Sequence, residues 1–355
     1  MRIGALFDLS GPERLAGNAM LLGASSAVRY FNQRLARMGY EIELSVKDTG
    51  SQEGSLLLGA MGLDKDRGVI ALIGPVNHRL VKTVMGYAEA HSLPLVLTAG
   101  RHPLNPTPWY KIKWTFGISP PIGHMSKAFF RDLRKRGIKK IGVLVDEGHG
   151  FDQDIPWIKA YGVESRIEVL DVEGFSTEDV DCVTQLQHLK DLGAELVLYR
   201  GDSRFLPRLF KSLDEAPLTV AFLMDTPLEG IQTHPGINRS SVLVQSPLLF
   251  LDDYLKSVQR PAIGAFKAAM ETTSLHSRHE ILAAAKAWDA VGLIVSAILN
   301  GAAPNRAGLL KVFSGRYSNH VEIRLTYHGL LGDFTPDRRD HCGLDTRDLH
   351  LLPLD

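Results

Sequence analysis

The sequence lacks net charge and has few cysteines. Its 355 residues contain 40 Lys and Arg against 40 Asp and Glu, so the basic excess with which general nucleic-acid binders neutralise phosphates is missing. Two cysteines are too few for a disulfide scaffold or a four-thiolate zinc site. Hydrophobic residues make up 45% of the chain, which is enough to bury folded cores and argues against disorder. A soluble protein of about two domains remains, since a domain takes ~150 residues.

Sequence motifs of common enzymes are missing as well. Neither GxxxxGK(S/T) nor GxGxxG occurs, and there is no GxSxG nucleophile elbow. His276 and His279 have helical spacing, but their polar setting favours a solvated helix start over a metal site. Residues 340–342 (Asp-His-Cys) favour a structural turn, because adjacent residues seldom converge on one atom. We therefore expect a binding protein rather than an enzyme, with no metal and no cofactor.

The longest apolar stretch, residues 281–303, contains Lys286 and Asp289. Charges so far from the ends of a bilayer span are costly, so we expect a buried core helix instead. Cys182 and Cys342 are expected to be free thiols. The chain opens directly on a strand-like run with no export signal before it. The protein is therefore expected to be either periplasmic or extracellular, with its signal removed, or cytoplasmic.

Short apolar runs alternate with amphipathic stretches, which is typical of βαβ units. Periodicity predicts a helix over residues 24–38 that ends at Gly39. A second helix is expected with Ser176 or Thr177 as its N-cap. Its apolar stripe comprises Val180, Val183, Leu186 and Leu189. Strands are expected at residues 3–8, 41–47, 69–73, 95–98, 140–145, 166–171, 196–199 and 220–224.

Residues 3–8 and 141–146 share the pattern Ile-Gly-x-Leu-x-Asp. Chance similarity between buried strands explains this shared pattern as readily as two similarly folded lobes do. The chain length favours the two lobes. We expect an α/β fold of two similar doubly wound parallel-sheet lobes. The first lobe is 1–116 plus about 246–325, and the second is 117–245 plus about 326–355. Strands starting at Val242 and Glu322 would carry the chain back across the boundary near residues 113–120 and form a multi-strand hinge.

Ligands of open α/β sheets bind at the carboxyl ends of the strands. In the first lobe these positions hold amides, hydroxyls and cations, which suit a carboxylate. In the second lobe they hold acids and aromatics, which suit a cation or an apolar body. The candidate ligand-binding residues are Ser10, Asn77, His78, Arg79, Thr98, Ala99, Gly100, Arg101, Phe151, Tyr199 and Asp225. The polar ones could instead cap helices or turns, and the arginines could be solvated. The set as a whole predicts an amino acid or a related organic acid as ligand.

Several segments, in this order and spacing, carry a family resemblance. They are LSG at 9–11, LDKD at 63–66, VIALIGP at 69–75, GIKKIGVLVD at 137–146 and FTPD at 334–337. Together they resemble the type I periplasmic binding proteins, specifically the branched-chain amino-acid receptors of ABC importers. The resemblance covers nearly the whole chain. It implies a clamshell of two lobes, joined by three crossovers, that closes over its ligand.

The resemblance also implies roles for residues. The ligand's carboxylate would be held by residues 77–79 and 98–101, and its ammonium by Asp225, with Phe151 and residues 199–203 alongside. Where relatives have a serine pair, this chain has Asn77-His78-Arg79, and Gly100-Arg101 replaces an Ala-Thr. We therefore expect a larger or more acidic carboxylate than leucine, or an aromatic acid.

The resemblance further implies a partner, the membrane permease of an ABC importer, and a monomeric receptor that binds no nucleic acid. Two alternatives stay open. One is a cytosolic ligand-sensing regulator of the same fold, and the other is an enzyme that uses Asp225 or His149.

Overall fold

The computed structural model describes residues 1–99, 112–148, 150–226, 228, 239–273, 275, 277–318 and 321–354. The chain forms two compact units. Unit 1 comprises Met1–Pro121 and Leu251–Asp348, and unit 2 comprises Ile122–Phe250 and Leu349–Asp355. The chain therefore passes between the units three times. Each unit is built on its own mainly parallel sheet, in strand order β2-β1-β3-β4-β5 or β15-β10-β9-β8-β6-β7, and this confirms the expected α/β fold.

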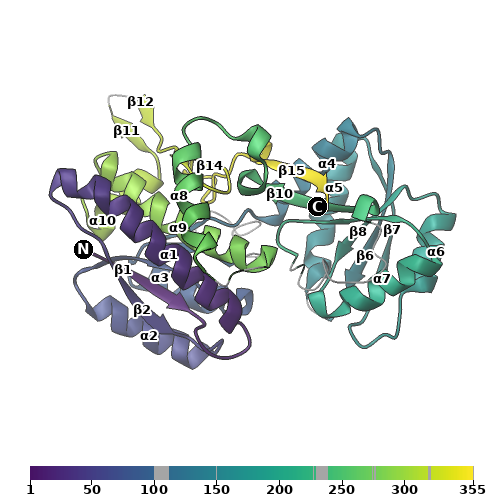
Figure 1. The fold of residues 1–355 in the computed structure, drawn as a ribbon, viewed down its shortest axis with the longest axis horizontal. Coiled ribbons are helices and arrows are strands. Elements are labelled where there is room, and N and C mark those ends of the chain that lie inside the picture. Colours follow the sequence, from purple (N-terminus) through teal and green to yellow (C-terminus); the bar gives the residue numbers. More distant parts are fainter. Residues whose placement is uncertain are drawn as a thin grey trace. The chain divides into compact units, whose positions relative to one another are not determined.

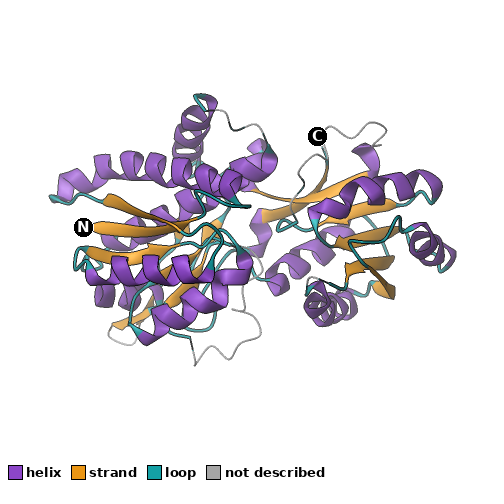
Figure 2. Ribbon diagram, turned by 90° about the horizontal axis from the view of Figure 1, so that it is seen from below, coloured by secondary structure: helices purple, strands orange, loops and turns teal. Residues whose placement is uncertain are grey.

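In unit 1, β1 lies between β2 and β3, and all neighbouring strands run parallel. Apolar side chains of α2 and α3 cover one face of the sheet. Helices α1 and α9 pack against each other on the other face (Figure 2). The N-terminal part of the unit consists of β1 (Arg2–Phe7), α1 (Arg14–Leu35), β2 (Glu43–Asp48), α2 (Glu53–Lys65), β3 (Val69–Ile73), α3 (Val81–Ala90), β4 (Leu95–Leu97) and β5 (Thr115–Gly117).

Helix α1 continues into a 3-10 turn, η1 (Ala36–Met38), before the chain turns away. Gly39 follows it with φ 74°, a left-handed conformation that costs little only for glycine. This confirms the expected end of the helix. The helix begins ten residues earlier than the expected start at residue 24.

The C-terminal part of unit 1 holds the long apolar helix α9. Among the described residues it is the one helix long and apolar enough to cross a membrane, and 78% of its most apolar window is buried in the protein. It packs on α1, which confirms the expected core helix. The elements here are α8 (Arg260–Glu271), α9 (Arg278–Leu299), α10 (Arg306–Phe313), β11 (Arg316–Ser318), β12 (Val321–Ile323), β13 (Tyr327–His328) and β14 (Asp333–Phe334).

Residues 326–348 pack in unit 1, whereas the sequence placed them in the second lobe. The reason lies in Asp289, which is fully buried on α9. Its carboxylate accepts hydrogen bonds from the Tyr327 hydroxyl at 2.9 Å and from the amides of Leu330 and Leu331 at 2.8 and 2.9 Å. A buried carboxylate needs such partners, and the segment that supplies them is held in unit 1.

The strand expected at Glu322 does not cross between units. It forms β12, which pairs antiparallel with β11 inside unit 1. The strand expected at Val242 is β10, which lies wholly in unit 2, and the chain leaves that unit after Phe250. The first crossing follows Pro121, close to the expected boundary.

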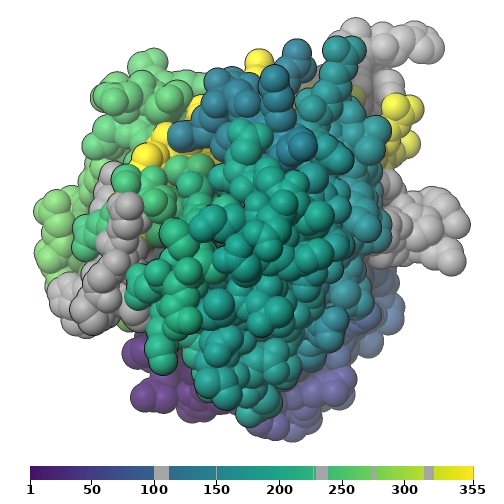
Figure 3. Space-filling view, turned by 90° about the vertical axis from the view of Figure 1, so that its right-hand side faces the viewer, coloured from purple at the N-terminus to yellow at the C-terminus, as the bar shows by residue number. Residues whose placement is uncertain are grey.

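In unit 2, β6 lies between β7 and β8, and β15 adds an antiparallel edge to an otherwise parallel sheet. Helices α6 and α7 bury apolar side chains on one face, and this teal part of the chain faces the viewer in Figure 3. The elements are α4 (Ile122–Lys135), β6 (Lys140–Asp146), α5 (Ile155–Ser165), β7 (Glu168–Phe175), α6 (Val183–Asp191), β8 (Leu196–Arg200), α7 (Leu206–Glu215), β9 (Thr219–Phe222), β10 (Val242–Pro247) and β15 (Leu349–Pro353).

Helix α6 begins later than the sequence indicated. Its N-cap residue is Cys182, and Val180 is 83% exposed instead of lying on the apolar stripe. The expected caps at Ser176 and Thr177 were wrong because Ser176 closes a separate turn: its amide donates to the Asp179 carboxylate at 2.8 Å. Both cysteines are free, as expected, and the structure buries both of them.

The segment Asp340-His341-Cys342 is a structural turn, as expected, and its His341 and Cys342 side chains are buried. The Asp340 carboxylate accepts the amides of Cys342 and Gly343 at 3.1 and 2.9 Å. His341 Nδ1 lies 2.6 Å from the carbonyl oxygen of Thr115. Burial lowers the pKa of His341 and raises that of the Cys342 thiol.

Candidate functional site

The candidate residues gather in two groups, one in each unit, at the carboxyl ends of adjacent parallel strands. In unit 1, Ser10, residues 77–79 and residues 98–99 follow β1, β3 and β4, which are neighbours in the sheet. In unit 2, Phe151 and Asp225 follow β6 and β9, and Tyr199 is next to the last residue of β8 between them. Parallel pairing puts the ends of adjacent strands at one edge, so each group lies along one edge of its own sheet.

Ser10 belongs to a turn organised by two aspartates. Its amide and that of Leu9 donate to Asp48 Oδ1 at 3.2 and 2.9 Å. Hydrogen bonding from Ser10 lowers the pKa of Asp48. Asp8, fully buried at the end of β1, accepts the Ser51 hydroxyl at 2.7 Å and a short hydrogen bond from Thr49. The two carboxylates therefore hold the loops after β1 and β2 together. Ser10 is exposed to solvent in the first of these loops.

The next two unit-1 candidates hold their own loops in place. The Asn77 side chain accepts the amide of Arg79 at 2.9 Å and so caps η2 (His78–Leu80), a single 3-10 turn. The Thr98 hydroxyl donates to the carbonyl oxygen of Pro75 at 2.9 Å, and the Ser119 hydroxyl donates to the carbonyl oxygen of Thr98 at 3.0 Å. These bonds join the loops after β3 and β4.

The remaining unit-1 candidates differ in exposure. His78 and Arg79 are exposed and put basic side chains at the end of β3, whereas Ala99 is buried. Gly100 and Arg101 lie outside the described residues, as do His149 and His276.

Unit 2 contains a fully buried arginine at the centre of its group. The Arg200 guanidinium lies at the end of β8 and donates to both oxygens of Asp225, at 2.7 and 2.9 Å. It also donates to Asp154 Oδ2 at 2.5 and 3.0 Å and to the Thr226 hydroxyl at 3.3 Å. Its centre stands 5.3 Å from the ring centroid of Phe151, a cation–π contact.

The two neighbouring carboxylates keep the Arg200 guanidinium charged. Burial alone would lower the pKa of Arg200, but Asp225 and Asp154 more than offset it and raise the pKa above its usual value. The guanidinium is therefore charged and pairs with two carboxylates. Asp225, expected to meet the ligand's ammonium group, accepts hydrogen bonds from Arg200 at both oxygens.

Tyr199 lies in the core of unit 2. Its ring stacks on Phe175 at 5.5 Å between centroids and meets Phe222 edge-on. Its hydroxyl donates to the carbonyl oxygen of Asp202 at 2.8 Å, and burial raises the pKa of the phenol well above its usual value. The Tyr199 side chain therefore makes its contacts with the core of unit 2 and with the turn at Asp202.

Two residues central to the network were not among the individually named candidates, although Arg200 lies in the segment 199–203 that the resemblance placed beside the ammonium. Asp154 ends η4 (Phe151–Asp154), and Arg200 ends the apolar run of β8. A signal for Arg200 was present, because a charged residue that closes a buried strand must find partners at the strand's carboxyl end. No comparable local signal marked Asp154.

The comparisons with known proteins bear on the whole chain. A family model described as "Periplasmic binding protein" matches residues 1–341. The chain belongs to the periplasmic binding protein family. Membership confirms the resemblance drawn from the sequence and agrees with two doubly wound units. None of the curated proteins matches the chain.

Solved structures of this family share the fold at low identity. An extracellular ligand-binding receptor from Rhodopseudomonas palustris is 17% identical, with TM-score 0.74, over 100% of this chain and 97% of that one. A solute-binding protein of an ABC transporter from R. palustris, in complex with 4-hydroxybenzoate, is 15% identical, with TM-score 0.72, over 99% and 90%. A leucine-binding protein from Thermotoga maritima is 14% identical, with TM-score 0.68, over 94% and 97%.

Proposed function

We propose that this member of the family is a non-enzymatic receptor for a small carboxylate, either an amino acid or a related organic or aromatic acid. Two solved relatives support the class: one was solved with 4-hydroxybenzoate and another is a leucine-binding protein. Both ligands carry a carboxylate, and only leucine carries an ammonium group. The two forms of the proposal, an amino acid and an acid without an amino group, therefore differ in the ligand's second polar group.

The buried Arg200 network is the observation that carries the proposal. It orients the Asp225 carboxylate at the carboxyl edge of the unit-2 sheet, and a carboxylate forms strong charge-assisted hydrogen bonds with cationic donors. A ligand ammonium group is a suitable partner. In unit 1, the exposed Arg79 follows β3, next to His78, and offers the positive charge that a carboxylate needs.

We propose that ligand binding draws on both units. A ligand that contacts both of them binds only a closed form, so it shifts the population toward that form. The three chain passages between the units are segments about which such a motion could occur. X-ray scattering tests this step: the radius of gyration should fall on addition of a saturating ligand, and an unchanged radius would rule out closure.

Delivery to the permease of an ABC importer is the proposed purpose of binding. Two structural neighbours support it, since both are proteins of ABC transporters. This role requires a periplasmic or extracellular location. Fractionation of the source cells with an antibody to this chain tests it, and a purely cytoplasmic signal would favour a ligand-sensing regulator.

A direct test of the receptor class is a thermal-shift screen against amino acids and organic acids, followed by mass spectrometry of the recovered ligand. A ligand at ~100 times its dissociation constant should stabilise the protein by about 2.7 kcal/mol. The ligand should be recovered unchanged. Turnover of the ligand would contradict a non-enzymatic receptor.

A further inference from the structure

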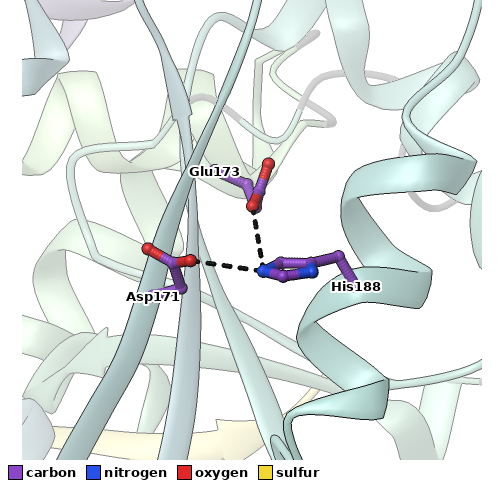
Figure 4. A group of neighbouring side chains, drawn as sticks. All are labelled: Asp171, Glu173 and His188. Carbon is purple, nitrogen blue, oxygen red and sulfur yellow. Dashed lines mark hydrogen bonds and ion pairs between the residues drawn. The ribbon is translucent and has the colours of Figure 1, made fainter.

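A group of three metal-ligating side chains lies in unit 2, outside the Arg200 network. Asp171 and Glu173 stand two residues apart on β7, so both project from the same face of the strand. His188 comes from α6, which packs against that strand. Figure 4 shows the imidazole pointing at both carboxylates. The side chains of Asp171, Glu173 and His188 are 49%, 26% and 47% exposed, so an ion from solvent can reach them.

The spacing of the ligand atoms matches that of a metal site. His188 Nε2 lies 3.3 Å from Asp171 Oδ2 and 3.5 Å from Glu173 Oε1. One ligand atom from each residue lies within 4.8 Å of the others. A tetrahedral zinc ion with ligands at about 2.1 Å holds them about 3.4 Å apart. An ion could therefore bind these three atoms with little movement of the side chains.

The charges also favour a cation. Strand β7 is the edge of its sheet, and within the described residues the ion pairs of Asp171 and Glu173 both go to this one imidazole. Two carboxylates and a neutral imidazole carry a formal charge of −2, which a divalent ion balances. The imidazole nitrogen selects the ion class, because Zn²⁺, Ni²⁺ and Cu²⁺ accept imidazole readily while Mg²⁺ and Ca²⁺ prefer oxygen.

We propose that Asp171, Glu173 and His188 form a surface site for a divalent transition-metal ion of the zinc class. Three protein ligands leave a fourth coordination position open to water or to another molecule. Binding would fasten α6 to the edge strand β7. The site does not depend on the proposed solute, because its residues take no part in the Arg200 network.

The test is a calorimetric titration of the metal-stripped, tag-free full chain with zinc chloride. One equivalent of zinc should bind at this site. His188→Ala and Asp171→Asn should each weaken binding at least about tenfold, since even partners outside the coordination shell change metal affinity by 10–100-fold. The two variants alter exposed side chains, and circular dichroism confirms that each is folded.

His91→Ala is the matched control. His91 is another exposed histidine, whose ring stacks on Tyr87 in unit 1, and its loss should leave zinc binding unchanged. Magnesium chloride should give no binding. The proposal is overturned if the wild-type chain binds no zinc, or if His188→Ala binds zinc as the wild type does. Either result would mean that the cluster is an ion pair only.

Discussion

Both carboxylate oxygens of Asp225 accept hydrogen bonds from the buried guanidinium of Arg200, at 2.7 and 2.9 Å. The arginine thus fixes the direction of an acid at the carboxyl end of β9. Because Arg200 also holds Asp154 and stands over Phe151, the loops after β6 and β9 are both tied to this one side chain at the end of β8. An edge held in this way changes little when a ligand binds, and this reduces the entropy that binding must overcome.

Replacing Arg200 should destabilise the protein strongly. Arg200→Met keeps much of the side-chain volume but leaves Asp154 and Asp225 buried without their cation, which costs about 3–5 kcal/mol. Arg204→Met is the control, since Arg204 pairs with Asp202 at 2.9 Å while its side chain is 68% exposed. Exposed pairs are worth roughly 1 kcal/mol or less. Urea denaturation measures both variants, and equal losses would show that burial of Arg200 contributes nothing.

Asp225→Asn should distinguish between the two classes of ligand. If the ligand has an ammonium group that meets Asp225, loss of the charge removes a charge-assisted hydrogen bond of about 1.5–3 kcal/mol, or roughly 10–150-fold in affinity. An acid without an amino group should be affected far less. Asp191→Asn, which changes an exposed acid at the end of α6, serves as control. Calorimetry with matched ligands measures the change. Unchanged affinity for an amino acid would remove Asp225 from the ammonium site.

The buried Asp289 should make stability depend on pH. Burial raises its pKa to about 7, against the hydrogen bonds from Leu330, Leu331 and Tyr327, which lower it. The folded state therefore binds a proton more tightly than the unfolded state, so this contribution to stability is fully present below about pH 4 and is lost as the pH rises toward 7. The loss amounts to roughly 4 kcal/mol.

Asp289→Asn tests this contribution, because an amide does not titrate. The difference in unfolding free energy, wild type minus variant, should fall between pH 4 and pH 7 and then level off. Urea denaturation at a series of pH values gives this difference. A difference that is constant with pH, or that rises, would contradict the burial-driven shift.

Two glycine substitutions should change stability in opposite directions. A Cβ on Gly23 of α1 would lie 2.0 Å from the carbonyl oxygen of Ala284 on α9, so Gly23→Ala should force the helices apart at a cost of ~1–3 kcal/mol. A Cβ on Gly54 of α2 would meet nothing within 4 Å. Gly54→Ala should therefore stabilise by ~0.5–1 kcal/mol through helix propensity. A stabilising Gly23→Ala would contradict the close packing of α1 on α9.

The parts of the fold with local causes could be predicted from the sequence. Gly39 ends its helix because only the next few residues decide a left-handed C-cap. The start of α6 could not be predicted in this way, since Ser176 and Asp179 bond each other and leave the cap position to Cys182. The sequence alone does not show which turn a cap-forming residue will close.

The candidate site also has a part that the sequence could predict and a part that it could not. The rule that ligands meet the carboxyl ends of parallel strands predicted which loops lie together along one edge of each sheet, since it depends only on strand order. The pairing of Arg200 with Asp154 and Asp225 spans 46 and 25 residues, and no short-range pattern encodes it. The same holds for residues 326–348, whose place in unit 1 depends on one distant carboxylate, Asp289.

The central claim is that this protein captures a small carboxylate. It is tested most directly by a thermal-shift comparison of each hit from the screen with its neutral methyl ester. We predict that the acid, at ~100 times its dissociation constant, stabilises the protein by about 2.7 kcal/mol and that the ester at the same concentration does not. Equal stabilisation by acid and ester, or no stabilisation by any carboxylate, would contradict the claim.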